Sequence, residues 1–179
     1  DITLASVEHL ARALDPGTAV SALGVDVDDE LIKRARKKHS EGNSGITDVE
    51  FKTADFISSP APEAFLVQRS GARFSLVFVL SITMWIHVNA GDAGLEAFLR
   101  KAAGLAHQMI IEPHEYRSYK TMNKRMKRLK APVPPAFQDI THRQDVVPWM
   151  LSILEDEGML LHKELGVTKW GRRLLWYVR

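Results

Sequence analysis

The 179-residue chain contains no cysteine, which excludes a disulfide framework and a thiolate zinc site. It also has no apolar run near the roughly 20 residues needed to cross a bilayer, and its first residues lack a signal-peptide pattern. We therefore expect a cytoplasmic protein without membrane contact. A cysteine-free composition is equally compatible with the nucleus.

Three functional motifs are missing as well. No GxGxxG follows a strand-like run, which argues against a nicotinamide oxidoreductase, and no GxSxG elbow is present, which argues against an α/β hydrolase. The seven histidines show no metal-like spacing and no neighbouring carboxylate cluster, so we expect no metal. The length fits one domain, and the net charge of +2 indicates no partner by itself.

Apolar periodicity alternates between strand-like and helix-like segments along the first two thirds of the chain. In chain order we predict a helix at 3–14, a strand at 20–27, a helix at 28–39, a strand ending in residues 51–56, a helix at 63–68, a strand at 74–82, a helix at 93–106 and a strand at 108–112. Asp28 can cap the second helix, whose inner side we predict to hold Leu31, Ile32 and Ala35. Residues 74–82 are apolar on both faces, which is typical of a central parallel strand.

The last third breaks this rhythm. A basic helix is predicted at 116–129, and a second helix at 146–157 ends at Gly158. Two strands, 160–166 and 174–178, follow with a connection short enough for an antiparallel hairpin. Together the segments predict an open α/β sheet, mostly parallel, with an antiparallel C-terminal hairpin.

Ligands of such sheets bind at the carboxyl ends of the strands. The predicted strand ends carry Asp26, Asp55 with Phe56, residues 80–89, and Glu112 with Pro113. A carboxylate at Asp26 suits ribose hydroxyls, while Asp55 can accept an exocyclic amine and Phe56 can cover a base. Structural roles are open for each: Asp26 could share helix capping with Asp28, Asp55 could cap the next helix, and Phe56 could be core.

The stretch LSITMWIHVNAGDAGL, residues 80–95, places Trp85, His87 and Asn89 at every second position. If this stretch leaves the strand in an extended conformation, the three side chains share one side. His87 and Asn89 could then donate hydrogen bonds to a ligand, and Trp85 could stack on a base. Asp92 is expected to cap the following helix. The alternative is that Trp85 and His87 are core residues.

The basic helix has two unlike faces at 100° per residue. One face carries Arg117, Lys120, Lys124, Lys127 and Arg128, and the other carries Tyr119, Met122, Met126 and Leu129. We expect the second face to dock and the first to be cationic. A solvated surface is the usual meaning of such a stripe, but no acidic residue occurs from Arg117 to Lys130. An anionic partner accounts for the unbalanced charge.

The same motifs resemble those of the bicoid-interacting-protein-three-like RNA methyltransferases over almost the whole chain. LSITMWIHVNAGDAGL is similar to that family's signature, and GVDVDDELIKRA, ADF, IIEPHEY and GVTKWGRRLLWYV fall in the matching order. YRSYKTMNKRMKRLK looks closer to the branch acting on RNA 5′-monophosphates than to the methylphosphate capping enzyme.

The resemblance implies a Rossmann-like class I methyltransferase domain spanning 1–179, S-adenosylmethionine as cofactor, and a small RNA with a 5′ phosphate, such as a transfer RNA or microRNA precursor, as partner. It assigns roles residue by residue: catalytic, His87 and Asn89; cofactor-binding, Asp26, Asp55, Phe56, Leu80 and Ser81; RNA- or phosphate-binding, Trp85, Glu112, Tyr116, Arg117, Lys120, Lys124 and Lys127. We expect a monomer.

Two departures from the family pattern stand out. The family places a first strand and a GxxxGD loop before the first helix, and Asp1 resembles the last residue of that loop. We therefore expect residues 1–179 to be an N-terminally incomplete domain, and an inactive RNA-binding module on a degenerate methyltransferase fold is the competing reading. In addition, EPHEY stands where relatives usually have EPQPW, so His114, Glu115 and Tyr116 replace Gln, Pro and Trp.

Overall fold

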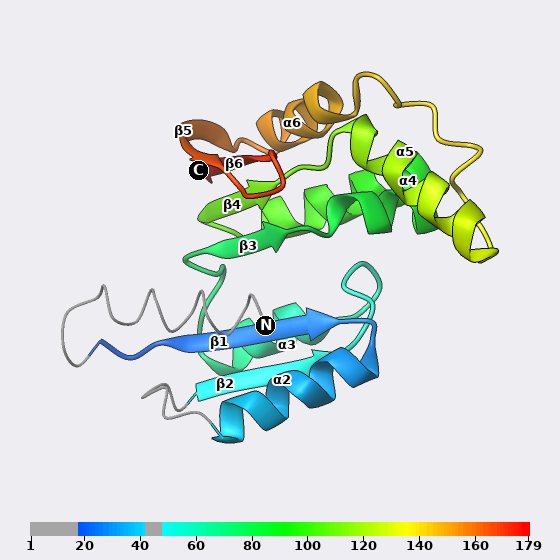
Figure 1. The fold of residues 1–179 in the computed structure, drawn as a ribbon. Helices are drawn as coiled ribbons and strands as arrows, with labels where there is room; N and C mark the ends of the chain where they lie inside the picture. Colours follow the sequence, from blue (N-terminus) through cyan, green and yellow to red (C-terminus); the bar gives the residue numbers. More distant parts are fainter. Residues whose placement is uncertain (1–17, 42–47) are drawn as a thin grey trace. The chain divides into compact units, whose positions relative to one another are not determined.

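A computed structural model describes residues 18–41 and 48–179, which form two compact units (Figure 1). The first unit comprises residues 1–71 and the second residues 72–179. The helix predicted at 3–14 lies outside the described residues.

The first unit contains two parallel strands and two helices. Strand β1 (Ser21–Asp26) pairs in register with β2 (Asp48–Thr53), and helix α2 (Asp29–Glu41) connects them along the chain. Helix α3 (Ala61–Gln68) follows β2 and begins after Pro60. This confirms the strand-helix order predicted for residues 20–68.

The start of α2 shows why this segment is helical. The Asp28 carboxylate accepts hydrogen bonds from the backbone N–H groups of Glu30 (2.9 Å) and Leu31 (3.3 Å), which confirms the predicted cap. Ile32 and Ala35 are buried against β2, as predicted. The prediction for Leu31 was wrong: its side chain is 45% exposed, because only the narrower stripe of Ile32 and Ala35 faces the strands.

The second unit is built on a four-stranded sheet with the order β3-β4-β6-β5. Strand β3 (Val77–Leu80) is parallel to β4 (Gln108–Glu112), whereas β6 (Arg173–Val178) is antiparallel to both β4 and β5 (Leu160–Val167). The predicted C-terminal hairpin is confirmed. The central position predicted for residues 74–82 does not hold in this sheet, because β3 pairs with β4 alone among the described strands and lies at an edge.

Three helices belong to this sheet (green to orange in Figure 1): α4 (Thr83–Gly104), α5 (Tyr116–Leu129) and α6 (Val146–Asp156). Helix α4 packs against α6, and side chains such as Leu95, Leu99, Met150 and Leu154 are fully buried. No helix among the described residues is long and apolar enough to cross a membrane.

The extended conformation predicted for residues 83–89 was wrong, because these residues form the first half of α4. Ser81 has a φ of 57°, in the left-handed region, and ends the strand abruptly. Beyond it Met84, His87 and Val88 are buried at helical rather than alternating spacing. Gly91, with a φ of 70°, bends the helix between its two halves, a conformation that glycine adopts without a steric penalty.

Candidate functional site

The first unit brings two predicted site residues to one edge. Asp26 and Asp55 follow parallel strands, and the Asp26 carbonyl accepts a hydrogen bond from the Ala54 N–H (2.9 Å). The Asp26 carboxylate accepts one hydrogen bond, from the Asp28 N–H (2.9 Å) to Oδ1, and Oδ2 has no partner among the described residues. Asp55 is exposed and closes its own turn, accepting hydrogen bonds from the Ile57 N–H and the Ser58 hydroxyl, so it does not cap α3. Phe56 is half-buried beside it.

In the second unit, the carboxyl ends of β3 and β4 carry a buried polar network. Glu112 is 3% exposed and accepts hydrogen bonds from Ser81 Oγ (2.5 Å), Thr168 Oγ1 (3.0 Å) and the Arg172 guanidinium (3.3 Å). Both oxygens of Glu112 are therefore engaged within the protein, and its predicted contact with the RNA stays a prediction. The Nε and NH2 groups of Arg172 have no hydrogen-bond partner within the described chain, so that edge of the guanidinium is available.

A second network, buried around His87 and Tyr119 and exposed at Thr141, joins α4 to α5. His87 is fully buried; its Nε2 lies 2.6 Å from Asp92 Oδ1 and its Nδ1 lies 2.9 Å from the Tyr119 hydroxyl. Asp92 Oδ2 accepts hydrogen bonds from the backbone N–H (3.0 Å) and the hydroxyl of Thr141. We call these four residues the seam. Asp92 thus pairs with His87 and Thr141, and no cap bond from it to α4 is seen in the described structure, contrary to the expectation.

The protonation states in the seam follow from its electrostatics. Burial would raise the pKa of Asp92, but hydrogen bonds from Thr141 and His87 outweigh it and bring the pKa to about 2. Burial lowers the pKa of His87 despite the carboxylate beside it, and burial raises the pKa of Tyr119. A neutral His87 that donates from Nε2 to the ionised Asp92 accepts at Nδ1 from the Tyr119 hydroxyl. Neither ring nitrogen of His87 is left for a ligand in this arrangement, and its catalytic role stays a prediction.

Trp85 and Asn89 lie on the other side of α4 from His87. Trp85 is 41% exposed, and the Asn89 side-chain amide donates to the Trp85 carbonyl (2.8 Å), one helical turn back. The helix therefore places His87 on one side and Trp85 with Asn89 on the other, whereas the sequence predicted all three on one side.

The two faces of α5 are confirmed in part. Tyr119 and Met122 are buried, as predicted for the docking face, but Leu129 is 58% exposed because the last turn extends beyond the core. On the cationic face, Arg117 pairs with Glu115 (2.9 Å) and also donates to the Gly171 carbonyl. Lys120 lies over the Tyr116 ring (5.3 Å).

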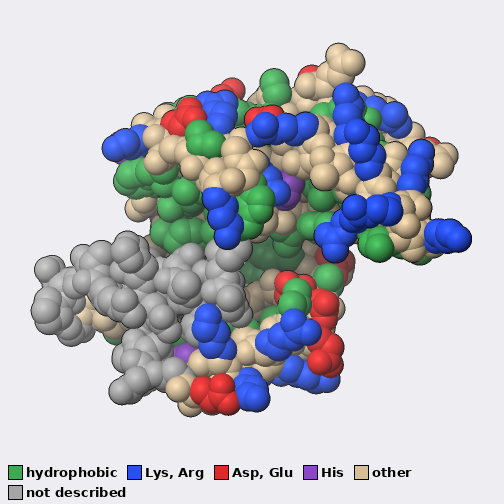
Figure 2. All heavy atoms as spheres, viewed as in Figure 1, with side chains coloured by type: hydrophobic (Ala, Val, Ile, Leu, Met, Phe, Trp, Pro, Cys, Tyr) green, Lys and Arg blue, Asp and Glu red, His purple; other side chains and the backbone are tan. Residues whose placement is uncertain are grey.

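The remaining cations of α5 are Lys124, Arg125, Lys127 and Arg128, all exposed. None of them has an ion-pair partner among the described residues. Lys and Arg side chains gather over the region of α5 in the space-filling view (Figure 2). The predicted excess of positive charge is therefore a feature of the folded surface.

A cleft of about 900 Å³ lies in the second unit beside α5. Its lining consists of Ser81, Met84, Trp85, His114, Arg117, Ser118, Thr121, Met122, Arg125, Met126, Leu129, Trp170 and Arg172. Two tryptophans, three methionines and three arginines thus share one cavity, and no Asp or Glu in the described part of the chain lines it. Aromatic faces bind bases by stacking and arginines bind phosphates, so the lining suits a nucleotide.

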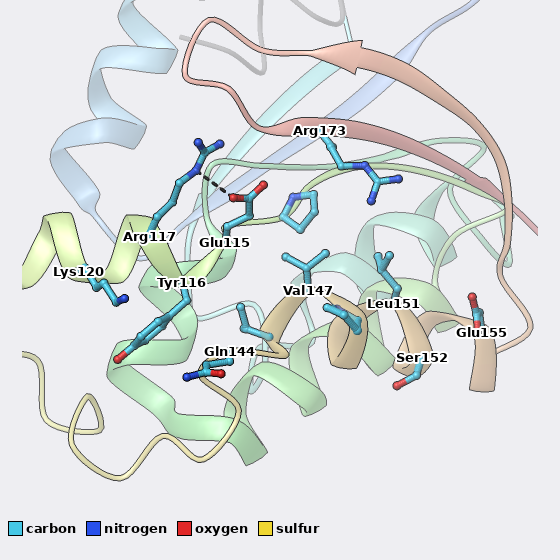
Figure 3. A pocket seen from close by; sticks show the side chains of 13 residues that line it. Glu115, Tyr116, Arg117, Lys120, Gln144, Val147, Leu151, Ser152, Glu155 and Arg173 are labelled. Carbon is cyan, nitrogen blue, oxygen red and sulfur yellow. Dashed lines mark ion pairs between the residues drawn. The ribbon is translucent and has the colours of Figure 1, made fainter.

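A second cavity, of about 810 Å³, lies between the start of α5 and α6 (Figure 3). Val147 and Leu151 of α6 form one wall, and Glu115 with Arg117 stands on the other. Its lining includes two glutamates, Glu115 and Glu155, which offset its basic residues. We call it the mixed-charge hollow.

The site residues predicted from the sequence leave out several residues of the cleft, among them His114, Trp170 and Arg172. All three are present in the quoted motifs EPHEY and VTKWGRR, and Trp170 and Arg172 occupy the tight connection between β5 and β6. Within residues 18–41 and 48–179, no three His, Asp or Glu side chains gather as a metal site. The absence of a metal remains a prediction.

Comparison with known protein families shows the family to which these features belong. The profile of the family described as Bicoid-interacting protein 3 (Bin3) matches residues 74–179, which include the cleft, the seam and α5. The chain belongs to this family.

Curated relatives divide the family further. The chain is 32% identical to the RNA 5′-monophosphate methyltransferase of Bos taurus, over 98% of this chain and 62% of that protein. It is also 32% identical to the pre-miRNA 5′-monophosphate methyltransferase of Xenopus laevis, over 98% of this chain and 70% of the relative. Similarity to the U6 snRNA methylphosphate capping enzyme Amus of Drosophila melanogaster is lower, at 29% over 70% of this chain and 42% of the enzyme. The chain thus lies nearer the monophosphate branch and spans less than two thirds of the bovine relative.

Solved structures show the fold. The magnesium protoporphyrin IX methyltransferase of Synechocystis with bound SAH superposes with a TM-score of 0.60 at 18% identity, covering 99% of this chain and 82% of that enzyme. The N-methyltransferase NodS of Bradyrhizobium japonicum gives a TM-score of 0.56 at 9% identity, covering 97% of this chain and 80% of NodS. The class I methyltransferase fold predicted from the sequence is confirmed.

Proposed function

We propose that this protein transfers a methyl group from S-adenosylmethionine to the 5′ phosphate of a small RNA, with a 5′-monophosphate as acceptor. The observation that carries the proposal is the cleft, in which an available Arg172 edge and two tryptophans meet without any carboxylate among the lining residues. The names of the bovine and Xenopus relatives support the same acceptor. A transfer RNA or microRNA precursor, a monomeric enzyme, and a cytoplasmic or nuclear location belong to the proposal.

Methylation of a phosphate does not require the protein to remove a proton from the acceptor. The second pKa of a phosphate monoester is about 6, so at neutral pH its oxygen is already an anionic nucleophile. Methyl transfer converts one P–O⁻ into P–O–CH₃ without a general base. The residues of the chain have to bind the phosphate, orient its oxygen and keep its charge paired. Arg172, held by Glu112 and Ser81, is suited to this work because its position is fixed while part of its guanidinium is unused.

The first unit offers groups that fit the cofactor. When bound, S-adenosylmethionine supplies a methyl group on a positively charged sulfur. Asp26 ends β1 with one carboxylate oxygen, Oδ2, unpartnered among the described residues, as hydrogen bonding to ribose hydroxyls requires. Asp55 and Phe56 follow the neighbouring strand and would contact the adenine. For Leu80 and Ser81, at the end of β3 in the second unit, cofactor binding stays a prediction from the sequence.

The cationic face of α5 would bind the RNA backbone. Lys124 and Lys127 are exposed and unpaired within the described residues, and backbone phosphates supply the negative charge they lack. Lys120 and Tyr116, stacked at the start of the helix, are proposed to extend the same surface.

The direct test uses the full-length protein, labelled S-adenosylmethionine and one RNA sequence made with a 5′-monophosphate or with a 5′-hydroxyl. Label should enter only the phosphorylated RNA, and phosphatase treatment before the reaction should abolish it. Equal methylation of both RNAs would show that a base or a ribose is the acceptor. Binding of both RNAs without methylation of either would favour the inactive RNA-binding module.

A variant tests the cofactor site. Asp26→Ala should weaken S-adenosylmethionine binding by roughly 1 to 3 kcal/mol, the scale of a lost charge-assisted contact. Asp26→Asn keeps the shape of the side chain but not its charge. Its affinity for S-adenosylmethionine should lie between those of the wild type and Asp26→Ala. Calorimetry that gives one affinity for all three proteins would reject the ribose contact.

A further inference from the structure

His114 is buried beside the cleft and is held from one side only. It is 2% exposed and follows Pro113 in the link between β4 and α5. Its backbone N–H donates to Thr83 Oγ1 (3.0 Å), and its ring Nδ1 lies 3.1 Å from the same hydroxyl oxygen. The Met84 N–H also points at Nδ1, at 3.5 Å.

These contacts fix the tautomer of the ring. Because Thr83 Oγ1 already accepts the His114 backbone N–H, its own hydroxyl proton is available to donate to Nδ1. The Met84 N–H can act only as a donor to the same atom. Nδ1 is therefore an acceptor, and the proton of a neutral imidazole lies on Nε2. Burial, with the positive charge of Arg172 nearby, lowers the pKa of His114 to about 4, so the ring is neutral at physiological pH.

His114 lines the cleft together with Ser81 and Arg172. Its second ring nitrogen, Nε2, makes no hydrogen bond to any described residue. A neutral N–H donor beside an arginine is a favourable partner for an anionic oxygen, because a hydrogen bond to a charged acceptor is about twice as strong as a neutral one.

We propose that His114 determines specificity for the 5′ phosphate: its Nε2–H donates a hydrogen bond to a phosphate oxygen that Arg172 also binds. This inference rests on the proposed function. It assigns the donor role to a histidine that lines the cleft, whereas His87 has both ring nitrogens engaged within the seam.

Two substitutions separate the two edges of the ring. Asparagine places its amide near the position of Nδ1, so His114→Asn keeps a partner for Thr83 and removes the donor from the cleft. Glutamine reaches the position of Nε2, so His114→Gln keeps a donor in the cleft and gives up the contact with Thr83. In the full-length protein, His114→Asn should lower kcat/KM for 5′-phosphorylated RNA roughly 10- to 100-fold, the range for a lost hydrogen bond to a charged group. His114→Gln should retain activity within a few-fold of the wild type.

Nitrogen-15 NMR of the histidine rings gives a readout that does not depend on turnover. The His114 ring, assigned through its loss in His114→Asn, should show an unprotonated Nδ1 and a protonated Nε2. Adding the 5′-phosphorylated RNA should shift Nε2, and the 5′-hydroxyl RNA of the same sequence should shift it much less. The signals of His87 should change little with either RNA.

The outcomes distinguish this inference from the proposed function. If the wild type methylates phosphorylated RNA and His114→Asn does so equally well, His114 is not a specificity determinant although the function stands. If the wild type methylates neither RNA, the proposed function fails, and the Nε2 shift alone decides whether His114 contacts the phosphate. A ring protonated on Nδ1, or an Nε2 that ignores phosphorylated RNA, overturns the inference.

Discussion

The seam and the cleft each contain a buried histidine, and the two differ in what the second edge of the ring meets. His87 is bonded on both nitrogens, to Asp92 and Tyr119, so it ties α4 to α5. The ring of His114 is bonded on Nδ1 alone, and the residue lines a cavity that arginine and tryptophan side chains also line. Burial by itself therefore does not distinguish a structural histidine from one that contacts a ligand. The contacts of both ring edges do.

The largest effect is expected from breaking the seam. Asp92→Ala leaves the buried His87 Nε2–H without its acceptor and removes a partner of Thr141, which is exposed. We expect the free energy of unfolding to fall by about 3 kcal/mol, the upper end of the cost of leaving a buried donor without its acceptor. Urea denaturation measures it. The control is Asp139→Ala, at an exposed position two residues before Thr141. It should change the free energy of unfolding by less than about 0.5 kcal/mol. Equal losses for both variants would contradict the role of the seam.

Acid should weaken the fold through the same two histidines. The unfolded chain binds a proton on His114 below pH 6.5, whereas the folded protein resists protonation until about pH 4. Stability is therefore complete above pH 6.5 and decreases as the pH falls toward 4, by about 2 kcal/mol at pH 5 for His114 alone. The lowered pKa of His87 acts with the same sign. His114→Gln should flatten this dependence in denaturation at pH 7.5 and pH 5, and an unchanged slope would count against the buried neutral ring.

The cleft, unlike the seam, should matter more for RNA than for stability. Trp170 is 56% exposed, so Trp170→Ala should leave the free energy of unfolding nearly unchanged. It should weaken RNA binding by about 1 to 2 kcal/mol if a base stacks on the ring. Leu165→Ala, also at an exposed apolar position of the hairpin but outside the cleft, is the matched control. Equal RNA affinities for both variants would remove Trp170 from the site.

The smallest effect concerns the cationic face of α5. The double variant Lys124→Gln/Lys127→Gln should reduce the salt dependence of RNA binding by a slope of about one per lost phosphate contact. Affinity should fall equally for phosphorylated and hydroxyl 5′ ends, because these lysines are assigned to the backbone. Lys38→Gln/Lys163→Gln removes the same charge from exposed positions outside α5. If the salt dependence of RNA binding has the same slope for both double variants, the net charge of the protein rather than α5 governs binding.

Much of the fold follows from periodicity. The sequence predicts the limits of α5, the strand-helix order of residues 20–68 and the terminal hairpin, because each has a strong apolar pattern bounded by clear turn residues. Residues 83–89 were misjudged because Trp85, His87 and Asn89 alternate over too short a stretch. The apolar residues Met84, Val88 and Leu95 are buried at helical spacing. The alternating polar and aromatic residues between them make this spacing hard to recognise in the sequence.

The candidate site was less predictable than the fold. The strand-end rule identified Asp26 and Asp55, which the structure places at one edge of the first unit. It could not identify His114 as a donor, because the tautomer is set by Thr83, 31 residues earlier in the chain. Nor could it find Arg172, whose partner Glu112 lies 60 residues away. Such contacts depend on tertiary packing, and local patterns do not record them.

The central claim is that the cleft, and not the mixed-charge hollow, receives the 5′ end of the RNA. Photo-crosslinking with a 5′-phosphorylated RNA whose first nucleotide is 4-thiouridine, followed by mass spectrometry of the full-length protein, tests it most directly. The account predicts crosslinks to peptides that contain Trp85 or Trp170. Crosslinks confined to residues 144–152, in the wall of the mixed-charge hollow, would contradict it.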